Sequence, residues 1–240
     1  MSDRFFLTEP PIGGRAFLLG DEARHCSRVL RAKEGDTIRV FDGRGTEWLA
    51  SITALARDTV TVALAEPLAT ESGPRVQLTL AVALPKGERQ KWLVEKLTEL
   101  GTARLVPLVT ERGVAEATEG ARARLERGVI EACKQCGRNT LMEIAAPATL
   151  GQLAARHPTS LRLIAHPGGM PLCDQPIASP GDEMQEIVAA VGPEGGFHPE
   201  ELALAAAAGF RPVSLGSHIL RIETAAIAVA SWKTLSLTSS

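Results

Sequence analysis

Up to residue 70, hydrophobic and polar positions form short runs with partial alternation. The runs "DTIRVFDG" (36–43), "TEWLASITAL" (46–55) and "DTVTVALAEPL" (58–68) are separated by turn signals such as Asp42-Gly43 and predict short strands. Between residues 20 and 36, "GDEARHCSRVLRAKEGD" predicts a short helix that starts near Asp21 and closes at Gly35. Short strands with few helices are typical of a small barrel-like module.

After residue 75 the pattern changes, because apolar strand-like runs now alternate with segments of helical spacing. We expect strands at 76–84, 104–109, 161–166, 186–191 and 211–215, and helices at 87–101, 119–138, 199–209 and 223–235. This alternation predicts an α/β domain with a mostly parallel sheet covered on both faces. The stretch "ATESGP" (69–74) is the expected linker, so we predict domains at 1–72 and 73–240.

Composition narrows the class of protein. The chain has 240 residues, of which 45% are hydrophobic and 22% charged, as in ordinary soluble proteins. Its four cysteines are too scattered for a disulfide framework. Its N-terminus lacks the apolar core of a secretion signal, and no apolar stretch is long enough to span a membrane. We therefore expect a cytoplasmic protein without a membrane partner. The net charge of −2 excludes a globally basic surface, so any RNA-binding surface must be a local patch.

Three segments rich in glycine or proline follow predicted strands of the second domain. They are "IAHPGGMP" (164–171), "VGPEGGFHP" (191–199) and "LGSHILRIETA" (215–225). Ligands of α/β sheets bind where the carboxyl ends of strands meet their loops. The middle segment lacks both phosphate-binding glycine motifs, and Glu194 would repel a phosphate, so a neutral or cationic ligand is expected. The alternative is that these glycines only form tight turns.

The same residues resemble a known family. "GPEGGF" followed by "EE", together with "LGSHILRIETAA", is similar to the paired C-terminal motifs of the RsmE family of ribosomal RNA methyltransferases, in the SPOUT superfamily. "LPKGERQKWLVEKLTELG", "EACKQCGR" and "HCSRVLRAKEGD" agree with it, so the resemblance covers nearly the whole chain. The sequence departs from the family pattern at His198, where a serine usually caps the helix, and at Ser217-His218, which replace a more basic pair. We expect weaker helix capping at His198.

The resemblance implies an enzyme that uses S-adenosylmethionine to methylate N3 of a uridine in 16S ribosomal RNA of the small subunit. It also implies an N-terminal PUA-like β-barrel domain, a SPOUT domain with a trefoil knot, and a homodimer to which the apolar closing helix could contribute. The glycine-rich loops would wrap the cofactor with their backbone. The expected cofactor-binding residues are Ala165, His166, Gly192, Glu194, Gly196, Leu215, Gly216 and Leu220.

The N3 atom of uridine carries a proton that must leave before a methyl group can be accepted. A cation near O2 or O4 would stabilise the developing anion, and a carboxylate or water would take the proton. We expect Arg221 and Glu223 to be catalytic, with a mutual or helix-capping salt bridge as the alternative. Glu194 could be the base or could form a turn by binding backbone amides.

For RNA we expect phosphate contacts from basic residues, because the chain has no tyrosine for stacking. Arg28 and Arg31 are three residues apart and would share one helical face. The other candidates are Lys86, Lys134 and Arg138. No metal is expected, because Cys133 and Cys136 lie in a helix without a second ligand pair.

Two other function classes remain at the sequence level. A non-catalytic RNA-binding or ribosome-assembly factor would use the N-terminal module alone, and the intact "GPEGGF" and "ILRIETA" argue against it. A Rossmann-type nucleotide enzyme would need G-x-G-x-x-G after an early strand, and the chain has none.

Overall fold

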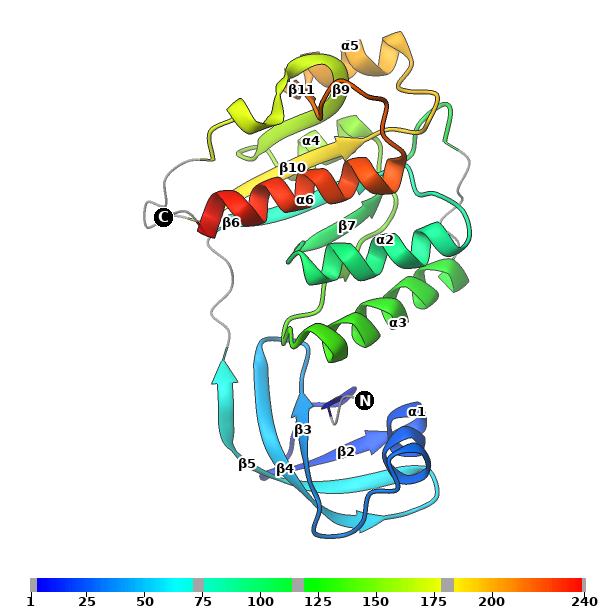
Figure 1. The fold of residues 1–240 in the computed structure, drawn as a ribbon, viewed down its shortest axis with the longest axis vertical. Coiled ribbons are helices and arrows are strands. Elements are labelled where there is room, and N and C mark those ends of the chain that lie inside the picture. The colour runs from blue at the N-terminus through cyan, green and yellow to red at the C-terminus, as the bar shows by residue number, and fades with distance from the viewer. Residues whose placement is uncertain (1–3, 71–75, 114–118, 178–183, 239–240) are drawn as a thin grey trace. The chain divides into compact units, whose positions relative to one another are not determined.

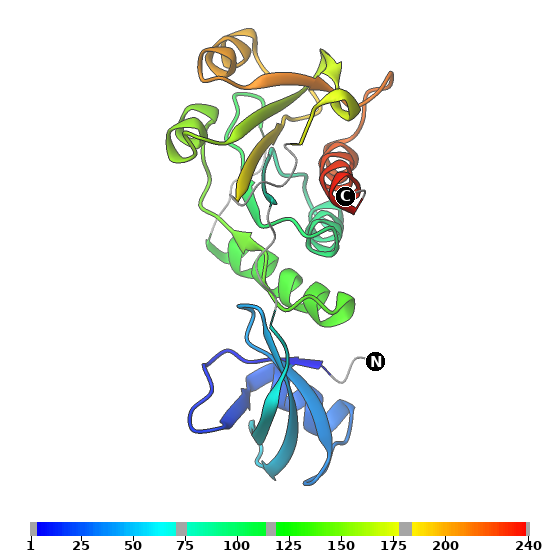
Figure 2. The ribbon, with the colours of Figure 1, turned by 90° about the vertical axis from the view of Figure 1, so that its left-hand side faces the viewer.

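The chain folds into two compact units. The computed structural model describes residues 4–70, 76–113, 119–177 and 184–238. The N-terminal unit consists of Met1–Gly73 together with Ile130–Leu141, and the C-terminal unit of Pro74–Val129 together with Met142–Ser240. Both are drawn in Figures 1 and 2. Of the expected linker, residues 69 and 70 end a strand, and 71–74 lie outside the described residues.

The N-terminal unit is a curled sheet of short strands. Its described strands have the order β1-β3-β4-β5-β2, and β1 pairs with β3 in parallel whereas the other pairs are antiparallel. Breaks in register between β4 and β5 help this sheet to bend around its apolar core (Figure 1). The strands are β1 (Arg4–Phe6), β2 (Arg15–Leu19), β3 (Thr37–Phe41), β4 (Thr46–Leu55) and β5 (Thr59–Thr70).

The helix expected between Asp21 and Gly35 is shorter than predicted. It consists of α1 (Gly20–Arg24) and a π-helical turn (His25–Val29). Arg31 follows with a φ of 54°, a left-handed conformation that cannot continue a right-handed helix. The expectation that Arg28 and Arg31 share one helical face is therefore wrong.

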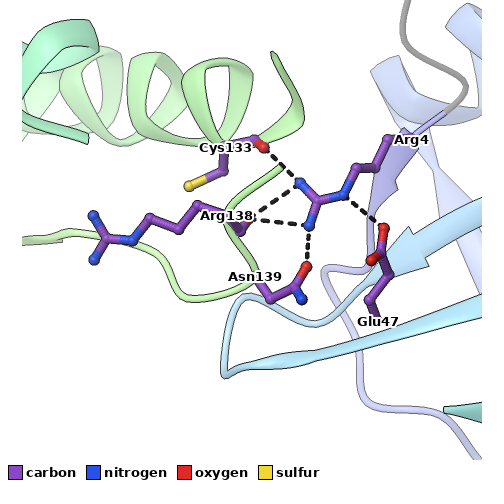
Figure 3. A network of polar contacts seen from close by, with 5 residues as sticks. All are labelled: Arg4, Glu47, Cys133, Arg138 and Asn139. Atoms are coloured by element: carbon purple, nitrogen blue, oxygen red, sulfur yellow. Dashed lines mark hydrogen bonds and ion pairs between the residues drawn. The ribbon is translucent and has the colours of Figure 1, made fainter. Parts of the chain in front are cut away.

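A buried arginine ties residues 130–141 to the N-terminal sheet (Figure 3). Arg4 is 5% exposed, and its Nε lies 2.9 Å from a carboxylate oxygen of Glu47. Its guanidinium also donates to the carbonyl oxygens of Cys133 and Arg138 and to the side-chain oxygen of Asn139. The centroid of the Phe41 ring is 4.1 Å from the Arg4 Cζ atom. One cation thus joins the last turn of a helix, the loop after it and the sheet.

The C-terminal unit is an α/β layer structure, as predicted. Every strand pair among its described residues is parallel, in the order β11-β9-β10-β6-β7-β8. Figure 2 shows α2 and α6 on one face of the sheet and α4 and α5 on the other. The strands are β6 (Val76–Val82), β7 (Arg104–Pro107), β8 (Glu143–Ile144), β9 (Leu161–Pro171), β10 (Gln185–Val191) and β11 (Arg211–Ser214). The helices are α2 (Glu88–Glu99), α3 (Glu119–Cys136), α4 (Leu150–Arg156), α5 (Pro199–Ala207) and α6 (Ile222–Thr238). Of α3, the residues from Ile130 onward belong to the N-terminal unit.

Several elements were not predicted. Strands β1 and β8 have three and two residues, which leaves little room for periodicity, and the five-residue β2 was also not predicted. Helix α4 begins with a capping box, in which the Thr149 side chain accepts from the Gln152 N–H and the Gln152 side chain accepts from the Thr149 N–H. The spacing of Thr149 and Gln152 is the sequence signal that identifies this helix start. The trefoil knot stays a prediction.

Candidate functional site

The first glycine-rich segment was expected at the end of a strand. It is instead a bulge inside β9. Ile164 of β9 pairs with Pro212 of β11, and the next pair in register is Met170 with Val213, so residues 165–169 leave the ladder. A Cβ atom built on Gly169 would lie 2.4 Å from the Pro212 backbone, so only glycine fits where the chain returns to the sheet. Residues of the bulge share the lining of one cavity with Val191 and Ser214, the last residues of β10 and β11.

The second segment is a tight loop between β10 and α5. A Cβ atom on Gly192 would meet the ring of Phe197 at 2.8 Å, and Gly196 has a φ of +69°. The guanidinium of Arg112 donates to the Gly195 carbonyl oxygen at 2.6 Å, which holds the loop from outside. At the start of α5, Nδ1 of His198 accepts the Glu200 N–H at 3.5 Å, a long contact for a helix cap.

The third segment follows β11 and leads into α6. Gly216 has a φ of +124°, and its N–H donates to the Ser214 hydroxyl oxygen at 3.4 Å. This backbone turn brings Leu215 through Leu220 alongside the other two segments.

Together the three segments enclose a cavity of about 410 Å³. Its walls are the β9 bulge, residues 191–197 and residues 214–220, with Ile222 and Ala225 of α6 below them. All eight residues expected to bind the cofactor line it: Ala165, His166, Gly192, Glu194, Gly196, Leu215, Gly216 and Leu220. Nδ1 of His166 accepts the Gly168 N–H at 3.1 Å, which fixes the ring at the bulge.

The two expected catalytic residues lie outside the lining of this cavity, and no ion pair joins them among the described residues. Glu223 lies in the first turn of α6, where the helix-capping alternative would place it. Arg221 is exposed and makes no ion pair among the described residues. Glu223 is buried, with its side chain 6% exposed, and its Oε2 atom lies 3.8 Å from Nη1 of Arg89. The same Arg89 nitrogen lies 3.3 Å from a carboxylate oxygen of Glu194. Arg89 therefore stands between the two glutamates.

The five residues expected to contact RNA lie in different surroundings. Arg28, Arg31 and Lys86 are exposed, and Arg138 is half-buried. Lys134 is 7% exposed, and its Nζ lies 2.9 Å from a carboxylate oxygen of Glu22 and 3.1 Å from one of Glu131. Burial lowers the pKa of Lys134, but the hydrogen bonds and charges of these two glutamates outweigh it and raise the pKa above its ordinary value. Its charge is thus already neutralised within the N-terminal unit.

No group of three or more side chains in the described part of the chain has the arrangement of a metal site. Cys133 is buried and Cys136 is exposed, and both are free thiols in α3. Within the same described residues, no helix combines the length and the apolar character needed to cross a bilayer.

Sequence reasoning missed three residues that shape the site. Arg89 and Arg112 reach the loop after β10 from distant parts of the chain, and Phe197 packs under Gly192. Arg89 lies in the family-like stretch "LPKGERQKW", whose Lys86 is an expected RNA contact. Its position near the start of the helix after β6 was visible, but its approach to Glu194 depends on which strands are neighbours.

Comparison with known proteins agrees with this geometry. Residues 72–233 match the model of the RNA methyltransferase domain, and residues 18–65 match that of the RNA methyltransferase PUA domain. The ribosomal RNA small subunit methyltransferase E of Synechocystis sp. is 37% identical over 85% of this chain and 67% of its own, and that of Rickettsia conorii is 34% identical over 83% and 80%. The crystal structure of the Neisseria gonorrhoeae enzyme of the same name, bound to S-adenosyl methionine, has a TM-score of 0.85 and 32% identity over 98% of both chains. The chain therefore belongs to the ribosomal RNA small subunit methyltransferase E family, with a PUA domain joined to an RNA methyltransferase domain of the SPOUT type.

Proposed function

We propose that this protein methylates N3 of a uridine in 16S ribosomal RNA, with S-adenosylmethionine as the methyl donor. The observation that carries the proposal is the cavity in which all three glycine-rich segments meet at one edge of the parallel sheet. The family of the chain supports methylation of ribosomal RNA. The choice of N3 and of uridine rests on the resemblance of "GPEGGF" and "ILRIETA".

The residues of the cavity fit this cofactor. Its walls combine backbone groups with the apolar side chains of Phe197, Leu215 and Leu220, which suits a purine ring and an aliphatic chain. Glu194 adds a carboxylate, which is compatible with a cationic ligand and unfavourable for a phosphate. When bound, the cofactor supplies a methyl group on a positively charged sulfur, and the C–S bond breaks as the N3–C bond forms.

The chain's own residues must then orient the base and manage the N3 proton. We propose Arg221, next to the cavity-lining Leu220, as a contact that holds the substrate at the cavity mouth. Glu194 lines the cavity and is half-exposed, so it can exchange a proton with solvent. Glu223 is too buried to reach a substrate directly and would act through Arg89.

We propose that residues 1–72 hold the RNA while residues 73–240 carry the chemistry. Arg28 and Arg31 in the first range are exposed cations that can approach phosphates, and Lys86 in the second range is an exposed cation that can add a contact from the chemistry-bearing domain. Lys134 remains a candidate only if RNA binding rearranges its ion pairs with Glu22 and Glu131. Arg138 remains a candidate as a half-buried cation. Such a protein acts in the cytoplasm, where small subunits mature.

We also propose a homodimer. Ala228 and Trp232 of α6 are half-buried and Leu235 is 66% exposed, so an apolar stripe with helical spacing remains on a helix whose opposite face is core. Light scattering at micromolar concentration tests this directly, and a monomer would exclude it.

The decisive experiment for the function maps modified nucleosides in small-subunit ribosomal RNA by mass spectrometry, with and without this protein. A single N3-methyluridine that depends on the protein is the expected result. Calorimetry with S-adenosylmethionine separates the rival class, because a non-catalytic assembly factor should release no heat. Methylation at another atom or another base would leave the family intact and overturn the proposed substrate.

A further inference from the structure

A second, smaller cavity lies beside the cofactor cavity at the same edge of the sheet. Its volume is about 170 Å³, and it shares Pro193, Glu194 and Ile222 with the larger cavity. The rest of its wall comes from the segment after β6, including Lys86, from Arg89 of α2, and from Gly113. The two cavities therefore touch the same loop, 192–197, from different sides.

The position of the second cavity follows from the order of the strands. β6 and β10 are neighbours, but the chain leaves β6 toward β7 on one side and leaves β10 toward β11, beyond β9, on the other. The loops at the carboxyl ends of β6 and β10 thus diverge and leave a crevice between them, which is where open α/β sheets bind their ligands. The sheet topology alone would place a ligand site here.

One cation beside this crevice, Arg89, faces two carboxylates. Nη1 of Arg89 lies 3.3 Å from Glu194 and 3.8 Å from Glu223, while the Arg89 side chain itself is 44% exposed. The Oε2 atom of Glu223 is buried and has no hydrogen-bond donor among the described residues. A buried carboxylate oxygen without a donor costs free energy unless a nearby cation compensates it. Glu223 therefore holds Arg89 at the crevice by charge and leaves its other donors available.

We infer that this second cavity holds the target uracil, with Arg89 facing a carbonyl oxygen of the base and Glu194 facing N3. The inference rests on the proposed function. The cavity has less than half the volume of the cofactor cavity, a size for one flat ring and not for a whole nucleoside. Because Glu194 and Pro193 line both cavities, a base in one lies next to a methyl donor in the other.

In this arrangement each group has one task. The N3–H bond breaks and its proton passes to the Glu194 carboxylate, which is half-exposed and returns it to water. The negative charge left on the base spreads onto O2 and O4, where the Arg89 guanidinium stabilises it. Glu223 does not touch the base and is a positioning residue for Arg89.

Arg89→Ala tests the inference, with Arg89→Lys and Lys91→Ala as matched variants. Lys91 is exposed on the same helix and does not line the cavity, so Lys91→Ala removes the same charge elsewhere. We expect Arg89→Ala to slow single-turnover methylation of saturating small subunits by about a hundredfold. Arg89→Lys should restore it in part, because an ammonium cannot reproduce the planar donors of arginine. The cofactor Kd should stay within about threefold, since Arg112 still holds Gly195.

Two results would overturn the inference. One is a rate for Arg89→Ala equal to that of Lys91→Ala. The other is a cofactor Kd weakened by the same factor as the rate, because Arg89 would then act only by holding the cofactor loop. If the wild-type protein makes no N3-methyluridine, the proposed function itself is wrong. That result is distinguishable from a failure of the inference about Arg89, which requires an active wild-type protein.

Glu194→Gln tests the proton transfer separately. The variant should bind cofactor and turn over slowly on normal small subunits. Subunits reconstituted with 5-fluorouridine, whose N3 proton is more acidic, should recover much of the rate in Glu194→Gln and gain little in wild type. An equal gain in both proteins would exclude Glu194 as the proton acceptor.

Discussion

Replacing Arg4 by methionine should loosen residues 130–141 from the N-terminal sheet. Arg4 and Glu47 are both nearly buried, with side chains 6% and 10% exposed and their charged atoms 2.9 Å apart. Arg4→Met leaves the Glu47 carboxylate in an apolar environment and removes the donor to two backbone carbonyls and to Asn139 (Figure 3). Removing one partner of such a buried pair costs about 3–5 kcal/mol. That is a large part of the stability of a small domain.

The measurement is hydrogen exchange followed by mass spectrometry, because a chain with two units has no single free energy of unfolding. Peptides covering 130–141 and β4 should exchange much faster in Arg4→Met, while peptides of β10 and α5 should not change. Arg4→Met combined with Glu47→Met removes the stranded carboxylate and should recover part of the protection. Arg24→Ala is the control, because its ion pair with Asp21 is exposed.

Unchanged protection of 130–141 in Arg4→Met would refute this reasoning, since Arg4 would then not be what holds that segment. A double variant that is no more protected than Arg4→Met would show that the carbonyl contacts, and not the buried Glu47, dominate the loss.

Four further predictions concern the site and the thiols. Gly196→Val and Gly216→Val should weaken S-adenosylmethionine binding at least about tenfold by calorimetry, because both positions have left-handed φ values of +69° and +124°. Gly151→Val is the control, because Gly151 has equally open space around an added Cβ but no left-handed φ. Arg221→Ala should leave the melting temperature unchanged, because Arg221 is exposed and unpaired among the described residues. It should raise KM for the small subunit more than Arg89→Ala does. A lower melting temperature with a normal KM would exclude the substrate contact. At pH 8, iodoacetamide should label Cys136 and Cys173 and spare Cys26 and Cys133, as peptide mapping would show. Burial raises the pKa of the Cys26 thiol from 9.0 to about 11. The free energy of unfolding should therefore fall as the pH rises through this window, because the thiol ionises first in the unfolded chain. Cys26→Ala should remove that fall.

Local sequence patterns predicted the elements whose ends carry their own signals. Gly101, with a φ of +71°, lies directly after the C-cap of α2, and Pro199 and Gly209 bracket α5 as expected. Gly196 and Gly216 also adopt the left-handed backbone that a glycine-rich loop suggests. These features depend on residues a few positions apart, which is the range over which propensity and periodicity act.

Features that depend on distant partners could not be predicted in this way. Lys134 pairs with Glu22, which is 112 positions away. A lysine that was expected to contact RNA is therefore part of a buried ion pair. The bulge in β9 exists because β11 meets both sides of it, and the alternation of β9 alone gives no sign of this. The inclusion of residues 130–141 in the N-terminal unit likewise depends on distant partners, among them Arg4, Glu22 and Gly43.

The site of the C-terminal unit shows why strand order carries information that periodicity lacks. Arg89 and Glu194 are 105 positions apart, and each alone is an ordinary charged residue near the start of a helix or in a turn. They meet because β6 and β10 are adjacent and parallel, so that the segments after both strands emerge at one edge. The same strands and helices arranged with β10 at the outer edge of the sheet would separate the two charges. The chemistry we infer therefore depends on the β6–β10 pairing as much as on the identity of either side chain.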